Sequence, residues 1–185
     1  MSVLEIVLLA ITALAGASIV WSTLTLGISP MPSSKKACLA MMKLLDETGF
    51  EKGNDPIIEL GSGWGNLLIP LAKRYPHRSI VGYEMSVVPW LISLILIKSL
   101  AIKNIKVHRQ NYLEADLSCT SVIFCYLFPG GMKALEDKLK TDNGNLKYLI
   151  SNNFSLLSLK PIKIVQLDDL YKSPVYLYSL KTLGE

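Results

Sequence analysis

The residues best suited to ligand chemistry form one glycine-rich segment, Glu59-Leu-Gly-Ser-Gly-Trp-Gly65. It follows a buried strand expected over 55–60 and opens a helix expected over 66–75, which is the context of a nucleotide-binding turn. Glycine lets the backbone turn tightly and approach a ligand without a Cβ in the way. The spacing is G-x-G-x-G, whereas a dinucleotide site prefers G-x-G-x-x-G. The acidic residue before it would repel phosphate, so the segment predicts a ligand that carries an ammonium group.

A second acidic residue, Glu84, ends the next expected strand, over 79–84. Ligands of open α/β sheets bind beyond the carboxyl ends of the strands, beside the switch in strand order. A carboxylate there can accept hydrogen bonds from both hydroxyls of a ribose. Together with Glu59, it predicts a ligand that joins an adenosyl group to an amino acid.

Strands and helices alternate along the rest of the chain. A helix capped by Ser33 or Ser34 is expected to run to about Glu47. Further helices are expected over 87–101 and 131–140, and further strands over 103–109, 120–126, 145–152, 162–167 and 175–181. No long helix separates the last two strands. The pattern predicts an α/β fold, doubly wound, with a mostly parallel seven-stranded sheet and an antiparallel end.

The helix over 87–101 is unusually apolar. Burial inside the domain and contact with lipid beside an N-terminal anchor both fit an all-round apolar helix.

The N-terminal residues 6–28 carry no charged side chain. Roughly 23 helical residues rise about 34 Å, enough to cross a hydrocarbon core of about 30 Å. A cleaved signal peptide or a buried helix would be the alternatives, but the preceding residues carry Glu5 and nothing basic. Lys35 and Lys36 follow the span, so the positive-inside rule predicts a domain facing the cytoplasm or an equivalent matrix. We expect a transmembrane anchor over 1–28 and one domain over 29–185.

The segment I-E-L-G-S-G-W-G and the strand-ending Y-E resemble motifs I and II of class I S-adenosylmethionine-dependent methyltransferases. The resemblance covers residues 55–140 well and implies a Rossmann-like fold with S-adenosyl-L-methionine as cofactor. Asn111 stands where that superfamily often has an acidic residue near the adenine. The cofactor-binding residues that the resemblance implies are Glu59, Gly61, Ser62, Gly63, Gly65, Glu84 and Asn111.

The chain is similar to the small membrane-anchored protein-lysine methyltransferases in the order of its parts. These parts are an N-terminal membrane helix, the segment S-P-M-P-S-S, a helix and the glycine motif. That family includes enzymes acting on the ATP synthase c subunit and on the adenine nucleotide translocase. The similarity implies a lysine substrate on a protein at or in a membrane. It also implies a substrate pocket near Pro30, Pro32, Tyr126 and Pro129.

Two residues, Trp64 and Asn66, depart from the Asp and Arg usual in that family. A methyltransferase for a small lipophilic molecule and a non-catalytic cofactor-binding module remain alternative interpretations.

Charge and cysteine content narrow the possible partners. The net charge is +4, and no basic block with interleaved aromatic residues occurs, so nucleic acid is not expected as a partner. The three cysteines Cys38, Cys119 and Cys125 show no C-x-x-C spacing, and there are only two histidines. Neither a disulfide framework nor a metal site is predicted, and reduced, mostly buried cysteines are expected. No catalytic base can be identified, which N-methylation tolerates because positioning carries much of the catalysis.

Overall fold

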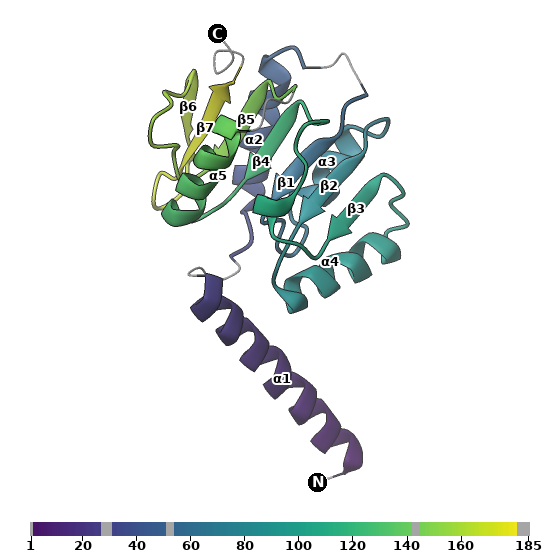
Figure 1. The fold of residues 1–185 in the computed structure, drawn as a ribbon. Helices are drawn as coiled ribbons and strands as arrows, with labels where there is room; N and C mark the ends of the chain where they lie inside the picture. The colour runs from purple at the N-terminus through teal and green to yellow at the C-terminus, as the bar shows by residue number, and fades with distance from the viewer. Residues whose placement is uncertain (1, 27–30, 51–53, 142–144, 181–185) are drawn as a thin grey trace.

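The computed structural model describes residues 2–26, 31–50, 54–141 and 145–180. One sheet of seven strands forms the centre of the domain, in the order β3-β2-β1-β4-β5-β7-β6 (Figure 1). The strands are β1 (Ile57–Leu60), β2 (Ile80–Tyr83), β3 (Ile105–His108), β4 (Val122–Cys125), β5 (Tyr148–Asn152), β6 (Lys163–Gln166) and β7 (Pro174–Ser179).

The sheet is parallel from β1 to β5, and β7 runs antiparallel to both β5 and β6. The predicted α/β class and the mostly parallel seven-stranded sheet with an antiparallel end are confirmed. Strand order reverses at β1, which pairs with β2 on one side and β4 on the other. The carboxyl ends of these three strands therefore meet at one edge, where a doubly wound sheet binds its ligands.

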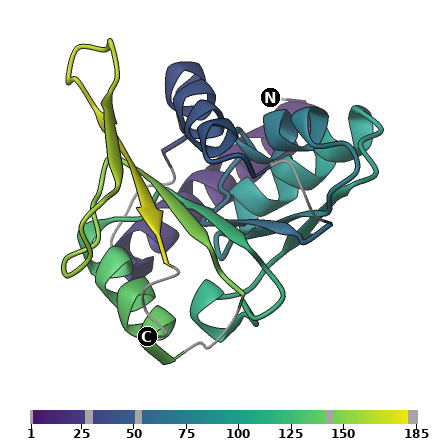
Figure 2. The same ribbon diagram turned by 90° about the horizontal axis from the view of Figure 1, so that it is seen from above.

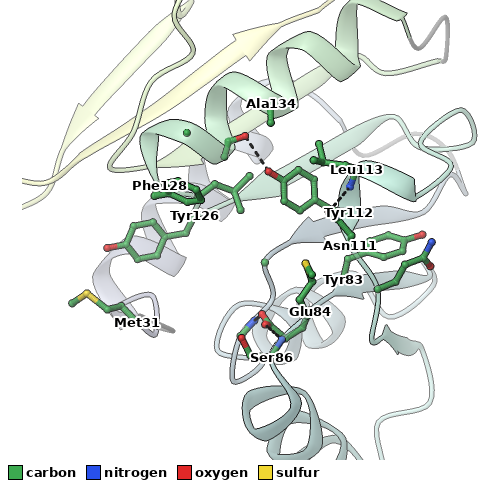
Figure 3. Close-up of a pocket in the computed structure, with 17 residues that line it drawn as sticks. Met31, Tyr83, Glu84, Ser86, Asn111, Tyr112, Leu113, Tyr126, Phe128 and Ala134 are labelled. Carbon is green, nitrogen blue, oxygen red and sulfur yellow. Dashed lines mark hydrogen bonds between the residues drawn. The ribbon is translucent and has the colours of Figure 1, made fainter. Parts of the chain in front are cut away.

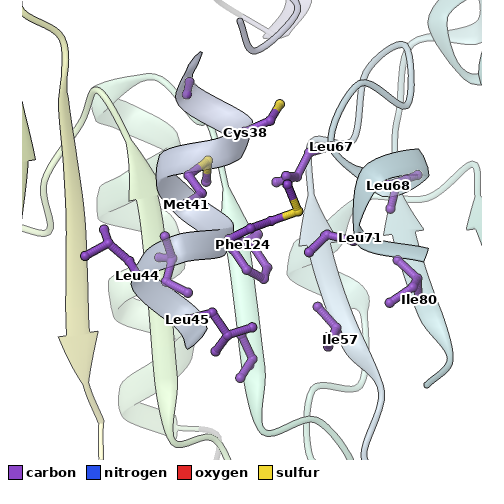
Figure 4. Packing of buried hydrophobic residues seen from close by; sticks show 14 of the residues in the cluster. Cys38, Met41, Leu44, Leu45, Ile57, Leu67, Leu68, Leu71, Ile80 and Phe124 are labelled. Carbon is purple, nitrogen blue, oxygen red and sulfur yellow. The ribbon is translucent and has the colours of Figure 1, made fainter. Parts of the chain in front are cut away.

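Helices cover both faces of the sheet (Figure 2). One core cluster joins the sheet to α2 (Lys35–Glu47), α3 (Leu68–Arg74) and Ile97 of α4 (Val87–Ser99). The other cluster joins it to α5 (Pro129–Thr141) and to the segment around the short 3-10 helix η1 (Tyr112–Glu114). Figure 4 shows Met41, Leu44 and Leu45 of α2 packed beside Phe124 of β4.

The predicted start of α2 is confirmed by its cap. The Ser34 hydroxyl accepts a hydrogen bond from the Ala37 N–H at 3.1 Å. Such a cap satisfies one of the four N–H groups that a helix leaves unpaired at its start. The helix expected over 66–75 is shorter, because the turn that begins at Gly61 continues to Leu67.

The N-terminal helix α1 (Val3–Leu26) projects from the domain (Figure 1). Its stretch Val3–Trp21 is long and apolar enough to cross a membrane, and none of it is buried within the chain. Length and composition alone do not separate an anchor from a signal sequence. It contacts the domain at α4. The two core clusters begin at Ala37 and at Ile58, so neither includes a residue of α1.

Gly82 is required by the packing beneath the glycine-rich turn. A Cβ at this position would lie 2.7 Å from Leu68 Cδ1 and 2.8 Å from Ser62 Oγ. We expect Gly82→Ala to lower the free energy of unfolding by about 1–3 kcal/mol, because inserting a methyl group into a packed site forces its neighbours to move. Denaturant unfolding of the domain measures the change. Gly16→Ala in α1, where nothing lies within 4 Å of the added Cβ, should leave that transition unchanged. Equal stability of both variants would contradict the packing argument.

Candidate functional site

The glycine-rich turn is held against the end of β2 by main-chain hydrogen bonds. The N–H groups of Gly61 and Ser62 both donate to the Tyr83 carbonyl, at 2.9 and 3.0 Å. Gly61, Gly63 and Gly65 have φ angles of 70°, 51° and 81°, which residues with a Cβ rarely adopt. A Cβ on Gly63 would meet nothing within 4 Å. At Gly63 the turn therefore presents bare backbone to open space at the carboxyl edge of the sheet.

Glu84 connects this turn to the start of α4 by hydrogen bonds. Its buried carboxylate accepts the Gly63 N–H at 2.8 Å with Oε2 and the Ser86 N–H at 2.7 Å with Oε1. Each carboxylate oxygen can accept a further hydrogen bond. Glu84 also lines the main pocket, so those remaining acceptor positions are available to a ligand there.

Glu59 is the third residue of β1 and is only 5% exposed. Its Oε2 has no hydrogen-bond partner among the described residues. Burial raises the pKa of this carboxyl well above its usual range, the charge of Glu84 raises it further, and a hydrogen bond with the Leu68 backbone opposes both. A buried carboxylate without a partner is unfavourable until a cation or a proton reaches it.

The main pocket has a volume of about 300 Å³ and opens at the carboxyl ends of β1, β2, β3 and β4 (Figure 3). The sequence-predicted residues that line it are Gly61, Gly63, Glu84, Asn111 and Tyr126. Asn111 caps η1, with its Oδ1 accepting the Leu113 N–H at 3.0 Å.

A smaller hollow of about 20 Å³ adjoins the main pocket, and Met31, Gly61, Gly63 and Tyr126 line both. The other residues that line it are Pro32, Ser33, Glu59, Ser62, Trp64 and Asn66. The two predicted carboxylates thus border adjoining hollows on either side of the same turn. The Ser62 hydroxyl is buried there, also without a partner among the described residues.

The remaining predicted residues lie further from the pocket. Gly65 lines neither hollow, and its Cα faces α4, since a Cβ there would lie 3.3 Å from Ser93 Cβ. Pro129 is the exposed first residue of α5 and lines neither hollow, although its neighbours Phe128 and Gly130 line the main pocket. Pro30 lies outside the described residues.

Sequence reasoning missed several pocket residues: Tyr83, Gln110, Tyr112 and Leu113. They lie at or just beyond the carboxyl ends of β2 and β3. The rule that located Glu84 could therefore have found them. Met31 is different, because it reaches the pocket from the segment before α2, which only the folded chain brings to this edge (Figure 3).

The site fits a ligand that carries both an ammonium group and a ribose. Glu59 Oε2 is a buried acceptor with no donor among the described residues, and the nearby Gly63 presents backbone without a side chain. Glu84 faces the larger hollow, which has room for a nucleoside. No basic side chain of the described residues lines either hollow, so nothing there would neutralise a phosphate.

Comparison with known proteins agrees with this geometry. Residues 59–163 match the family described as the ANTKMT methyltransferase domain. The chain is 26% identical over 112 residues to the adenine nucleotide translocase lysine N-methyltransferase of Mus musculus. That match covers 59% of this chain and 48% of the mouse protein, so the chain spans about half of its relative's length.

Solved structures share the fold. An RNA methyltransferase from Salinibacter ruber in complex with S-adenosyl-L-homocysteine superposes with a TM-score of 0.68 and 24% identity, over 84% of this chain and 100% of that one. A magnesium protoporphyrin IX methyltransferase from Synechocystis PCC 6803 with bound S-adenosylmethionine gives a TM-score of 0.61 and 12% identity, over 78% and 79% of the two chains.

The fold and the motifs define a class I S-adenosylmethionine-dependent methyltransferase, as the sequence predicted. Within that class, the chain belongs to the ANTKMT methyltransferase domain family.

The raised pKa of Glu59 predicts how the stability of the ligand-free chain depends on pH. A carboxyl whose folded pKa exceeds its unfolded value binds its proton more tightly when folded. The contribution of Glu59 to the free energy of unfolding is therefore fully present below the pKa of the unfolded chain, and it is lost as pH rises through the pKa of the folded chain. We expect Glu59→Gln, which resembles the protonated form, to remove this loss and to stabilise the ligand-free chain at neutral pH by about 1–3 kcal/mol.

Denaturant unfolding across about pH 5 to 8 measures this difference. Glu47→Gln is a matched control, because Glu47 is paired with Lys163 on the surface and its loss should change stability little. A Glu59→Gln variant less stable than the wild type at neutral pH would contradict the assignment of an unpaired buried carboxyl.

Proposed function

We propose that the chain N-methylates lysine on a membrane or membrane-proximal protein, using S-adenosylmethionine. The buried carboxylate of Glu59 beneath the glycine-rich turn, whose Oε2 has no partner among the described residues, carries the cofactor part of this proposal. The lysine part is supported by membership of the ANTKMT methyltransferase domain family and by the mouse relative's name.

Each predicted cofactor residue has a role in this proposal. Glu59 receives the ammonium of the methionine end, and the backbone from Gly61 to Gly65, with Ser62, lies along that end. Glu84 accepts the ribose hydroxyls with the acceptor positions that Gly63 and Ser86 leave open. Asn111 contacts the adenine edge with its amide nitrogen, since its oxygen already accepts the Leu113 N–H.

The substrate would enter beside Tyr126, which lines both hollows and stacks on Phe154 with ring centroids 6.3 Å apart. Pro32 borders the smaller hollow, and we include Pro30 and Pro129 in the entrance on the family resemblance. A lysine must lose a proton before it can attack, and desolvation between such apolar walls favours its neutral form. The bound cofactor supplies an activated methyl group. The residues around it align the nucleophile and exclude water.

The membrane part of the proposal assigns residues 6–28 to a transmembrane anchor within the segment 1–28. Residues 29–185 then form the catalytic domain on the side of Lys35 and Lys36, facing the cytoplasm or an equivalent matrix. The exposed apolar stretch Val3–Trp21 supports an anchor. An anchor confines enzyme and substrate to one surface, which favours targets in or near the same membrane.

Transfer of labelled methyl groups tests the enzyme class and the lysine substrate in one experiment. Membranes incubated with the wild-type chain and labelled S-adenosylmethionine should incorporate label into protein, as methyl-lysine. Glu84→Ala should lower incorporation by about tenfold or more, because it removes charge-assisted hydrogen bonds to the cofactor. Glu47→Gln should not.

Three other outcomes would each overturn the proposed activity. Label confined to a lipid extract would show a small lipophilic substrate. Label in protein but not on lysine would exclude the lysine assignment. Cofactor binding without any transfer would show a non-catalytic module.

Removal of residues 1–28 tests the anchor separately. The two core clusters begin at Ala37 and at Ile58, so the shortened chain should fold and bind S-adenosylmethionine with unchanged affinity. Methylation of membrane protein should fall, while methylation of a soluble peptide carrying the same lysine should not. Equal activity of both chains on intact membranes would contradict the anchoring role.

A further inference from the structure

The helix α4 has an apolar outer surface. Its buried stripe consists of Pro89, Ser93 and Ile97, spaced four residues apart along one side. The exposed side of the helix carries Leu91, Ile92, Ile95 and Leu96, which are 47%, 37%, 56% and 41% exposed. A helix on the surface of a domain usually carries polar residues on this side.

The helices α2 and α5 follow that usual pattern. The exposed side chains of α2 include Lys35, Lys36 and Lys43, and those of α5 include Lys133 and Lys140. In contrast, α4 contains one charged residue, Lys98, close to its end. A contiguous exposed apolar patch of this kind marks a surface that contacts a membrane or another protein.

Charge around α4 favours an anionic surface as the partner. Between residues 86 and 113 the sequence contains four basic residues and no acidic one. All four are exposed: Lys98, Lys103, Lys106 and Arg109. An apolar helix face flanked by exposed basic side chains is the combination that binds in the interfacial region of anionic bilayers.

The position of α4 links this surface to the N-terminal helix. α1 packs against α4, and Figure 1 shows α4 running across the end of the domain from which α1 projects. The helix begins at Val87, immediately after the pocket residues Glu84 and Ser86. Two further pocket residues, Met31 and Met85, are 64% and 42% exposed at the same edge.

We propose that the outer face of α4 lies in the headgroup region of the bilayer beside α1. This inference rests on the proposed anchor and deepens it, because α1 alone would fix one point of the domain and leave its orientation free. With α4 in the interface, the domain has a second contact, and the carboxyl edge of the sheet is held close to the membrane. A lysine that protrudes only a short way from the bilayer could then reach the pocket.

Depth-dependent fluorescence quenching of the full chain in anionic phospholipid vesicles tests the proposal. Single cysteines at Leu14, Ile95 and Leu39 would carry an environment-sensitive dye, in a Cys119→Ser background. The native Cys38 and Cys125 are buried, and burial raises the pKa of both thiols to about 12, so they react slowly with the label. Leu39 is the matched control, because it is a 64% exposed leucine on α2.

The dye at residue 95 should lose about half of its emission to nitroxides placed shallowly in the acyl chains, since interfacial helices bury their apolar face about 5–10 Å deep. The dye at residue 39 should keep its emission, and the dye at residue 14 should be quenched by deeply placed nitroxides. Unchanged S-adenosylmethionine binding confirms that each labelled chain is folded.

The results that would contradict the α4 contact, the anchor and the lipid partner differ from one another. If the dye at residue 14 is quenched but the dye at residue 95 remains in water, the α4 contact is wrong and the anchor stands. If neither is quenched, the anchor itself is wrong. The dye at residue 95 could instead report an apolar environment without being quenched by nitroxides, and this change could increase with protein density. That result would mean that the face of α4 binds a second protein chain, and it would overturn the lipid proposal.

Discussion

The structure depends on the approach of two carboxylates beneath one glycine-rich turn. Glu84 is stabilised by the N–H groups of Gly63 and Ser86, and through them it fixes the turn to the start of α4. Glu59 has no such compensation at Oε2, and the negative charge of Glu84 adds to the rise in its pKa. A buried carboxylate oxygen without a hydrogen-bond partner lowers the free energy of unfolding, and Glu59 has this effect at the topological switch point of the sheet. We infer that the site is built for a cation, and that ligand binding stabilises the site.

The fold could be predicted from the sequence where local patterns dominate. Ser34 was predicted among the candidate caps of α2, and every predicted strand has a counterpart in the sheet. The antiparallel end followed from the missing helix between the last two strands. Sequence periodicity could not give the strand order, because pairing depends on contacts between distant segments. Nor could it decide whether α4 is buried, because an all-round apolar helix looks the same whether its outer face meets protein or lipid.

The candidate site was predicted in part. The fold brings together four of the predicted residues, Glu59, Gly61, Gly63 and Glu84. Each lies at or just beyond the carboxyl end of β1 or β2, and these two strands are neighbours in the sheet. Gly65 belongs to the same motif, yet its Cα faces Ser93, so the motif serves packing and the pocket at once. Met31 reaches the pocket from a segment without regular structure, where sequence periodicity gives no position for a side chain. The sequence identified no catalytic base, and the roles that we propose for the pocket residues are alignment of the nucleophile and removal of water.

The most direct test of the central claim is calorimetric binding of two ligands to the wild type and to Glu59→Gln. S-adenosylhomocysteine carries the amino acid end, whereas 5′-methylthioadenosine lacks it. A charge-assisted hydrogen bond contributes about 1.5–3 kcal/mol, so the wild type should bind the first ligand about 10- to 100-fold more tightly. Glu59→Gln should remove most of that preference and leave the affinity for methylthioadenosine unchanged. If the variant keeps the full preference for S-adenosylhomocysteine, Glu59 does not receive the ammonium group and the account of the site is wrong.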